Sequence, residues 1–263
     1  MRTTTAGDIT LYYEQHGQGP DLVLIGGLTS DHQIWRSALR TFSQHYRVLI
    51  FDNRGAGQSS SPDYPYTIEM MANDTLNLMD ALHIKKAHIL GHSMGGGIAM
   101  QLALLAPDRV DKLILVSSRP KISAVAAMLF GMREKLQKLN VPEELLAEYT
   151  MPILFGDRFL QNNMNIKGFA QWTVRNPHPQ TPIGYKHQLH ASSTRDIIDE
   201  LPNITADTLI INGTEDVLVP ITYADKLSQQ FPNARLALIP DCAHMPHVEQ
   251  PEAFEKAVMG FIR

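Results

Sequence analysis

The sequence of 263 residues contains one cysteine, no long apolar run and no strong excess of charge of either sign. Cys242 has no second cysteine with which to form an internal disulfide, which predicts a reducing compartment and a cytoplasmic protein. The N-terminus lacks the apolar stretch of a signal peptide, and no run reaches the roughly 20 apolar residues of a membrane-spanning helix. A net charge of −4 argues against a general nucleic-acid binder. The composition therefore predicts an ordinary globular protein that neither inserts in a membrane nor binds nucleic acid.

Sequence motifs for metals and cofactors are also missing. The H-E-x-x-H motif of a common metal site is absent from the sequence. Gly55-Ala56-Gly57 is too short to count as a phosphate-binding loop. We therefore expect no metal and no cofactor, so that any chemistry depends on the side chains and the backbone alone.

The most informative stretch is Gly91-His92-Ser93-Met94-Gly95, which follows a short apolar run and precedes a helical pattern. A serine at the tip of a tight strand-to-helix turn has a strained backbone and needs neighbours without side chains. Gly91 and Gly95 meet this requirement. The N-terminus of the following helix would stabilise negative charge that develops near the serine. The stretch is typical of a G-x-S-x-G nucleophile elbow, and the alternative is a glycine-rich turn that holds a serine by chance.

Short apolar runs alternate with helical patterns along most of the chain. Buried strands are expected at 22–25, 48–51, 87–90, 113–116, 208–211 and 236–239. Wholly apolar strands separated by helices predict an α/β fold, with a mostly parallel central sheet and helices on both of its faces. An opening hairpin that ends near Glu14 is expected at an edge of this sheet.

The alternation stops between Arg119 and Ser193, where helical spacing continues but no strand pattern is found. We therefore predict a core made of residues 1–118 and 194–263, and a helical cap of residues 119–193 lying over the sheet. The cap contains more basic than acidic residues. Solvated helix faces explain this excess more simply than a docking patch does.

A serine hydroxyl needs an adjacent base, and histidine is the usual base because its pKa lies near neutrality. Functional groups in open parallel sheets collect at the carboxyl ends of the strands. Of the eleven histidines, His244 lies in the loop after the last predicted strand, and His247 is its nearest rival. His92 is expected to point away from Ser93, and His32 could line the mouth of the pocket.

A carboxylate must orient the base and stabilise the imidazolium. Glu215 and Asp216 follow the next-to-last predicted strand, and we favour Asp216 with Glu215 as the fallback. Asp52 also follows a strand. With Arg54 beside it, an ion pair or a bracing role in the loop is the simpler interpretation.

In this chain order, Ser93, Asp216 and His244 resemble the catalytic triad of an α/β-hydrolase, and the resemblance covers the whole chain. The motifs that carry it are Gly26 to Leu28, Asp52 to Ser59, Gly91 to Gly96, Gly213 to Pro220 and Ala243 to Pro251. The resemblance implies an oxyanion hole formed by the backbone N–H groups of Leu28 and Met94.

The residue at the elbow separates the activities found in this family. Dehalogenases and epoxide hydrolases of the fold carry an aspartate there, so Ser93 argues against both. We expect a serine hydrolase that cleaves a carboxylic ester or lactone through an acyl-enzyme intermediate. The size and the cap resemble enol-lactone hydrolases, and also esterases that act on a methyl ester carried by acyl carrier protein. The expected partner is thus a small-molecule ester or lactone, with an acyl carrier protein as the alternative.

Two hypotheses of other classes stay open. A small-molecule receptor of the same fold would keep the triad and turn over slowly. A lyase or C–C bond hydrolase would need a cap arginine near Ser93, and the candidates are Arg133, Arg158 and Arg175.

Apolar residues of the cap are the candidates for substrate contacts. They are Met128, Met132, Phe155 and Trp172. Packing of the cap against the core explains the same pattern equally well.

Overall fold

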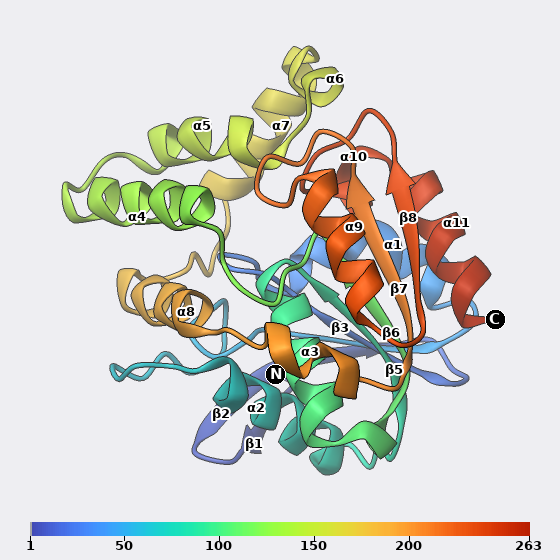
Figure 1. Ribbon diagram of the computed structural model, residues 1–263. Helices are drawn as coiled ribbons and strands as arrows, with labels where there is room; N and C mark the ends of the chain where they lie inside the picture. Colours follow the sequence, from blue (N-terminus) through green and yellow to red (C-terminus); the bar gives the residue numbers. More distant parts are fainter. Residues whose placement is uncertain (1) are drawn as a thin grey trace.

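In the computed structural model, which describes residues 2–263, a single eight-stranded sheet has the order β1-β2-β4-β3-β5-β6-β7-β8 (Figure 1). Its strands are β1 (Thr3–Ala6), β2 (Ile9–His16), β3 (Asp21–Ile25), β4 (Arg47–Phe51), β5 (Ala87–His92), β6 (Val110–Val116), β7 (Asp207–Gly213) and β8 (Ala234–Ile239). Strands β3 to β8 run parallel, and β1 and β2 join the edge antiparallel. The predicted α/β fold and the edge hairpin are confirmed.

Helices cover both faces of the sheet because the strands present apolar side chains to both sides. In β3, Val23 packs with one core cluster, whereas its neighbour Leu24 packs with the other. The first face is covered by α2 (Ile68–Ala81), α3 (Met94–Leu105) and α9 (Ile221–Gln230). The second is covered by α1 (Arg36–Phe42) and α11 (Pro251–Ile262). The central strands β3 to β7 are thus covered on both faces, which explains their apolar runs.

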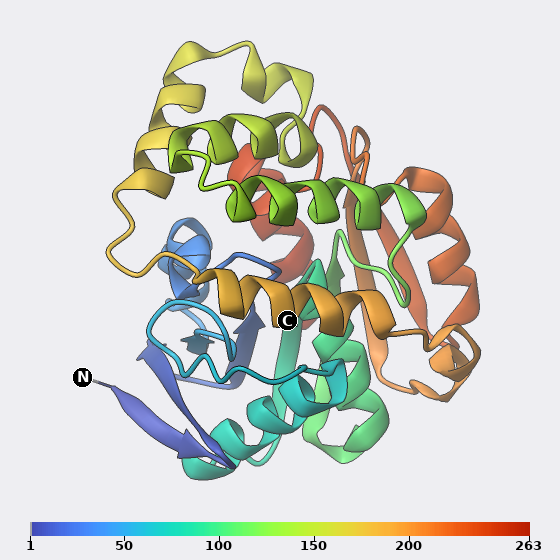
Figure 2. The same cartoon turned by 90° about the vertical axis from the view of Figure 1, so that its left-hand side faces the viewer.

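A run of helices separates β6 from β7. It contains α4 (Ala124–Lys138), α5 (Glu143–Leu154), α6 (Asp157–Leu160), α7 (Asn163–Val174) and α8 (Pro182–Thr194). Figures 1 and 2 show α4 to α7 grouped at the top of the molecule, on the side toward which β7 points. Met151 and Phe155 of this run pack into the second core cluster, which ties the helices to the sheet. Among residues 2–263, no helix has the length and apolarity that a membrane span requires.

The remaining short helices lie in connections. They are η1 (His32–Trp35), η2 (Pro107–Arg109), η3 (Ile198–Asn203) and α10 (Pro246–Glu249). The loops that follow the carboxyl ends of β3, β5, β7 and β8 carry the residues on which the chemistry depends, as expected for an open parallel sheet.

Candidate active site

Ser93 occupies the sharp turn between β5 and α3. Its φ of 54° lies in the left-handed region that a non-glycine residue adopts only under constraint. The constraint comes from close packing: a Cβ on Gly91 would lie 2.2 Å from the carbonyl oxygen of Gly95, and a Cβ on Gly95 would lie 2.2 Å from that of Ile25. Substituting either glycine would therefore force the turn open. The glycines that the sequence analysis singled out are required by backbone contacts on both sides of Ser93.

Asp216 and His244 form a buried hydrogen bond. The Nδ1 atom of His244 lies 2.9 Å from Oδ2 of Asp216, and both side chains are almost fully buried. The other oxygen, Oδ1, accepts the N–H groups of Leu218 and Val219 at 2.8 Å each. Because a carboxylate only accepts, Nδ1 carries the imidazole proton and Nε2 keeps its lone pair. The fallback residue, Glu215, instead accepts the N–H of Asp157.

Ser93 and His244 line one cavity, which we call the histidine cavity. Six of its lining residues are Leu28, His92, Ser93, Leu154, Trp172 and His244. No hydrogen bond within residues 2–263 engages Ser93 Oγ, which leaves this hydroxyl without a partner in the cavity that His244 also lines. Side chains that follow β5, β7 and β8 are thus brought together at the carboxyl edge of the sheet.

The backbone around Ser93 offers two N–H groups. Leu28, in the loop after β3, lines the histidine cavity beside Ser93, and Met94 is the first residue of α3. A Cβ on Gly27 would lie 3.2 Å from the Cβ of Ser93, so this loop passes directly against the elbow. In the described part of the chain, neither the Leu28 N–H nor the Met94 N–H donates a loop hydrogen bond to a carbonyl. Both are available to an oxygen bound next to Ser93.

Glu249 holds the loop that carries His244, a role that the sequence analysis missed. Its Oε1 accepts the N–H groups of Ala243 and Met245, at 2.9 and 3.2 Å, and its Oε2 accepts the N–H of Gly156 at 2.7 Å. Burial raises the pKa of Glu249, and the three N–H donors act in the opposite direction. The only sequence signal was its place six residues after Ala243, in the motif that carries the family resemblance.

The rival histidines are packed differently. His92 donates from Nε2 to the carbonyl oxygen of His244 at 2.8 Å, so its side chain packs against His244. Both ring nitrogens of His247 lack a partner in the described chain, and its ring lies 4.9 Å from that of Trp35. Burial lowers the pKa of His92 far below its usual value and that of His247 to about 3. Both rings stay neutral near pH 7; His92 supports His244 through its hydrogen bond and ring contact, and His247 packs against His92.

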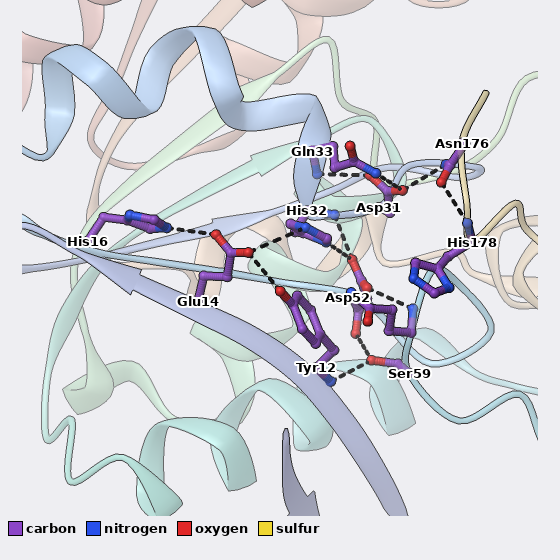
Figure 3. A network of polar contacts seen from close by, with 11 residues as sticks. Tyr12, Glu14, His16, Asp31, His32, Gln33, Asp52, Ser59, Asn176 and His178 are labelled. Carbon is purple, nitrogen blue, oxygen red and sulfur yellow. Dashed lines mark hydrogen bonds and ion pairs between the residues drawn. The ribbon is translucent and has the colours of Figure 1, made fainter. Parts of the chain in front are cut away.

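A second aspartate–histidine pair, Asp52 and His32, braces the loop after β3 (Figure 3). Asp52 Oδ1 accepts both the backbone N–H and Nδ1 of His32, at 2.6 and 2.8 Å, and Oδ2 accepts the N–H of Gln58. Burial alone would lower the pKa of His32, but the hydrogen bond to Asp52 and the charges of Asp52, Asp31 and Glu14 raise it. Arg54, which the sequence placed beside Asp52, binds Asp74 instead.

The same corner brings the oxygens of Asp31 and Asp52 and a ring nitrogen of His32 within 4.8 Å of one another. Each of these potential ligand atoms already has a hydrogen-bond partner within the protein. Asp31, for example, accepts hydrogen bonds from Gln33 and from Asn176 of the helical run (Figure 3). These contacts hold the loop and leave the cluster with a structural role.

Comparison with known proteins agrees with this arrangement. A family model described as the alpha/beta hydrolase fold matches residues 20–251. The chain belongs to the α/β-hydrolase family. It is 29% identical to a protein of Azorhizobium caulinodans named as the carbamate hydrolase RutD, over 97% of this chain and 96% of that one. It is 30% identical to a pimeloyl-[acyl-carrier protein] methyl ester esterase of Nitrosomonas europaea, over 93% of this chain and 96% of the relative.

Solved structures give the same answer. The enol-lactonase of Burkholderia xenovorans superposes with a TM-score of 0.89 at 28% identity, over 99% of each chain. An esterase of Thermogutta terrifontis superposes with a TM-score of 0.86 at 27% identity, over 100% of this chain and 96% of the other. These likenesses extend over the whole length, including the helices between β6 and β7. The chain is therefore an enzyme of this family, a hydrolase.

The four apolar residues predicted to contact the substrate of this hydrolase do not all line the same space. Trp172 lines the histidine cavity, whereas Phe155 lines a neighbouring groove with Phe159 and Phe169. Met128 and Met132 are wrong as cavity residues, because they are 77% and 45% exposed and lie in the lining of neither space.

Helical geometry explains the error at Met128 and Met132. The face of α4 that packs inward carries Ala126, Leu129, Phe130 and Arg133. These positions follow the i, i+3, i+4, i+7 spacing, so Met128 and Met132 fall on the opposite face.

Of the three candidate arginines, one reaches the cavity. Arg133 lines the histidine cavity and is buried, with its guanidinium 4.7 Å from the ring centre of Tyr185. Arg158 forms an ion pair with Asp241 at 3.5 Å, and Arg175 is exposed to solvent.

Proposed function

We propose that this hydrolase is a serine hydrolase that cleaves a carboxylic ester or lactone, with Ser93 as nucleophile, His244 as base and Asp216 as its orienting carboxylate. The observation that carries the proposal is the buried hydrogen bond between Asp216 and His244, beside a cavity that Ser93 also lines. The strained turn at Ser93 supports it, because exposing a hydroxyl at the tip of such a turn has a conformational cost.

The chemistry follows from the lone pair on Nε2 of His244. Ser93 Oγ attacks the carbonyl carbon while Nε2 takes the hydroxyl proton, which forms a tetrahedral oxyanion. The oxyanion collapses, the bond to the alkoxy oxygen breaks, and His244 returns the proton to the leaving alcohol. A water molecule then attacks the acyl-enzyme with His244 again as base, and it releases the carboxylic acid and regenerates Ser93. Asp216 keeps the proton on Nδ1 throughout and stabilises the imidazolium.

The N–H groups of Leu28 and Met94 are placed to stabilise the oxyanion. Both lie next to Ser93 without a carbonyl partner in the described loops, and Met94 begins a helix of 12 residues. Donors of this kind typically contribute about 3–4 kcal/mol each to the transition state.

We also propose that residues 119–193 act as a cap over this site, on a core of residues 1–118 and 194–263. Support comes from Arg133, Leu154 and Trp172, which belong to this run and line the histidine cavity. The carbonyl oxygen of Leu154 accepts the N–H of His244 at 3.0 Å, which fastens the run to the catalytic loop.

The relatives' names narrow the substrate only to a class: a carbamate hydrolase, an acyl-carrier-protein methyl ester esterase and an enol-lactonase all cleave an acyl group from a heteroatom. A small ester or lactone fits the enclosed cavity best. A carrier protein finds less support, because Lys138 pairs with Glu134 at 2.8 Å and Arg133 is buried, so neither offers a free charge at the surface. For the same reason, Lys138→Glu should leave the KM for an acyl-carrier ester unchanged.

C–C bond hydrolysis is the second candidate, and the observation that favours it is Arg133 in the histidine cavity. Such a reaction needs a cation to hold an anionic or enolised group near Ser93. Assays with a 1,5-diketone and with an ester of the same size, on wild type and Arg133→Met, separate the two. Turnover of the diketone that exceeds that of the ester and is lost in Arg133→Met would replace the ester proposal.

The direct test is hydrolysis of a small chromogenic ester by wild type and Ser93→Ala. Because loss of a triad member typically costs about 10⁴–10⁶ in kcat, a drop of less than about a thousandfold would contradict the proposal. A small-molecule receptor of this fold would instead bind the ester with a large thermal shift and turn it over slowly, so the thermal shift is measured in parallel.

A further inference from the structure

A second cavity meets the histidine cavity at Ser93, and we call it the arginine cavity. Its polar lining comes from Ser93, Ser117, Arg119, Lys121, Ser192 and Arg195. Leu28, Ser93 and Phe130 line both cavities, so the two cavities adjoin at Ser93.

The proposed mechanism, on which this inference rests, decides which part of a substrate enters which cavity. His244 gives its proton to the leaving oxygen, so the leaving group must lie on the side that His244 lines, in the histidine cavity. The acyl chain then extends to the other side of Ser93. That side is the arginine cavity, which Met94 and Gly97 of the first turn of α3 also line.

The arginine cavity contains cationic side chains without matching acids. No Asp or Glu of the described chain lines it. Lys121 is paired outward with Asp196 at 2.6 Å. Arg195 is only 9% exposed. Its Nη1 donates to the carbonyl oxygens of Arg119 and Pro120, whereas its Nε and Nη2 have no hydrogen-bond partner in the described chain. Nη1 of Arg119 is likewise buried without a partner.

Burying a guanidinium without an acidic partner destabilises the folded state, because no ion pair within the protein offsets the loss of hydration. Burial lowers the pKa of Arg195 to about 9, which still leaves it charged near neutral pH. Two donors on a planar fork are suited to both oxygens of a carboxylate. Arg195 lies against α3, where a Cβ on Gly97 would be 3.4 Å from its Nη1, and the partial positive charge of the helix N-terminus reinforces the preference for an anion.

We propose that this hydrolase takes esters or lactones whose acyl part ends in a carboxylate, and that Arg195, assisted by Arg119, binds this carboxylate in the arginine cavity. The product of the reaction is then a dicarboxylic acid. Arg133 lines the opposite cavity and stacks on Tyr185, so it does not compete for the acyl carboxylate.

The test compares monomethyl esters of succinate, glutarate and adipate with methyl esters of monocarboxylic acids of matched length. We expect at least one anionic ester to exceed its neutral match in kcat/KM about tenfold or more. In Arg195→Met this preference should disappear, and Arg195→Lys should keep part of it because the charge stays and the fork is lost. Arg175→Met, which removes an exposed arginine outside both cavities, serves as the charge-matched control and should keep the wild-type preference.

A second pair of substrates tests whether the arginine cavity binds the acyl part of the substrate or its alcohol part. Moving the carboxylate to the alcohol, as in 4-acetoxybutyrate compared with butyl acetate, should make the rate insensitive to Arg195→Met. Equal losses for both positions of the carboxylate would show a general electrostatic effect and overturn the assignment. Equal kcat/KM for the anionic and neutral acyl groups in wild type would overturn it as well.

Binding without turnover separates this inference from the proposed function. Calorimetry on Ser93→Ala should show glutarate or adipate binding at least tenfold tighter than butyrate, and the additional substitution Arg195→Met should abolish that difference. If wild type cleaves no ester but this binding pattern is found, the carboxylate site stands and the proposed reaction fails. If the dicarboxylate binds no better than butyrate, the carboxylate site is wrong whatever the reaction.

Discussion

Two aspartate–histidine pairs lie in loops at the carboxyl edge of the same sheet. Asp216 and His244 are joined at 2.9 Å, and Asp52 and His32 at 2.8 Å; all four side chains are buried. In both pairs Nδ1 faces the carboxylate. The bond between the partners therefore does not show which pair is suited to catalysis and which one only stabilises its loop. What differs is the surroundings of Nε2.

His244 has Ser93 as a neighbour along a shared cavity, whereas Nε2 of His32 lies 3.7 Å from the carboxylate of Glu14. The ring of Tyr12 packs 4.8 Å from the His32 ring (Figure 3). Carboxylates around a histidine raise its pKa and so favour the protonated form, which accepts no further proton. The chemistry of a pair therefore depends on which group lies beside the second ring nitrogen, Nε2, of its histidine.

The largest effect is expected from Asp216→Asn. The amide cannot hold the proton on Nδ1 in the same way, so kcat for an ester should fall about 10⁴-fold. Because Asp216 also accepts the N–H groups of Leu218 and Val219, the thermal midpoint should fall as well. Steady-state kinetics and thermal unfolding of the same preparation measure both. A loss of less than tenfold in kcat would mean that Asp216 does not orient the base.

Asp52→Asn should destabilise the fold without a comparable loss of kcat. Asp52 accepts the backbone N–H and Nδ1 of His32 and the N–H of Gln58, so its loss removes buried, charge-assisted hydrogen bonds. We expect the free energy of unfolding to fall by about 2–4 kcal/mol and kcat to fall by less than about tenfold. Denaturant titration and ester kinetics check the two values, and a stable but inactive variant would contradict the bracing role.

Unpaired buried imidazoles should make the fold sensitive to acid. The pKa of His247 is about 3 when folded and about 6.5 when unfolded, so its contribution to stability is present above pH 6.5 and is lost as the pH falls. Between pH 7 and 5 this costs about 2 kcal/mol. His247→Phe should remove that part of the pH dependence, whereas His190→Gln, at an exposed position on α8, should not. Unfolding curves at several pH values provide the slopes.

The effect of His32 on the pH dependence of stability has the opposite sign. Its folded pKa is raised, so its contribution to stability is present below its unfolded pKa and is lost as the pH rises through the folded value. Glu14→Gln removes one of the charges that raise it and should lower the pKa of His32 by less than about one unit, because Asp52 stays in place. Titration of the ring protons by NMR measures this shift, and an unchanged pKa would remove Glu14 from the comparison.

Much of the fold and the three proposed catalytic residues could be predicted from the sequence. Apolar runs of four to six residues identify buried strands, and the rule that functional groups follow strand ends led to Ser93, Asp216 and His244. The rule works because each strand end fixes the direction of the next few residues. It does not say which neighbour a side chain meets, so the pairing of Asp52 with His32 could not be predicted.

The helices between β6 and β7 were harder to predict for a physical reason. These helices have two partly apolar faces, and the sequence does not say which one packs inward; Met128 and Met132 were therefore assigned to the wrong face. Arg195 follows α8 with no motif around it, and only the folded chain brings it next to Gly97. Arg119 offered a signal, because it comes directly after Ser117 and Ser118 at the end of β6.

Covalent labelling tests the central claim most directly, because it needs no knowledge of the substrate. A fluorophosphonate reacts with an activated serine, whose Oγ bonds to phosphorus as fluoride leaves. Intact-mass and peptide mass spectrometry should find one adduct per chain, on Ser93, formed at near wild-type rate in Asp52→Asn and far more slowly in Asp216→Asn. An adduct on another serine, no adduct at all, or equal rates in the two aspartate variants would contradict the account.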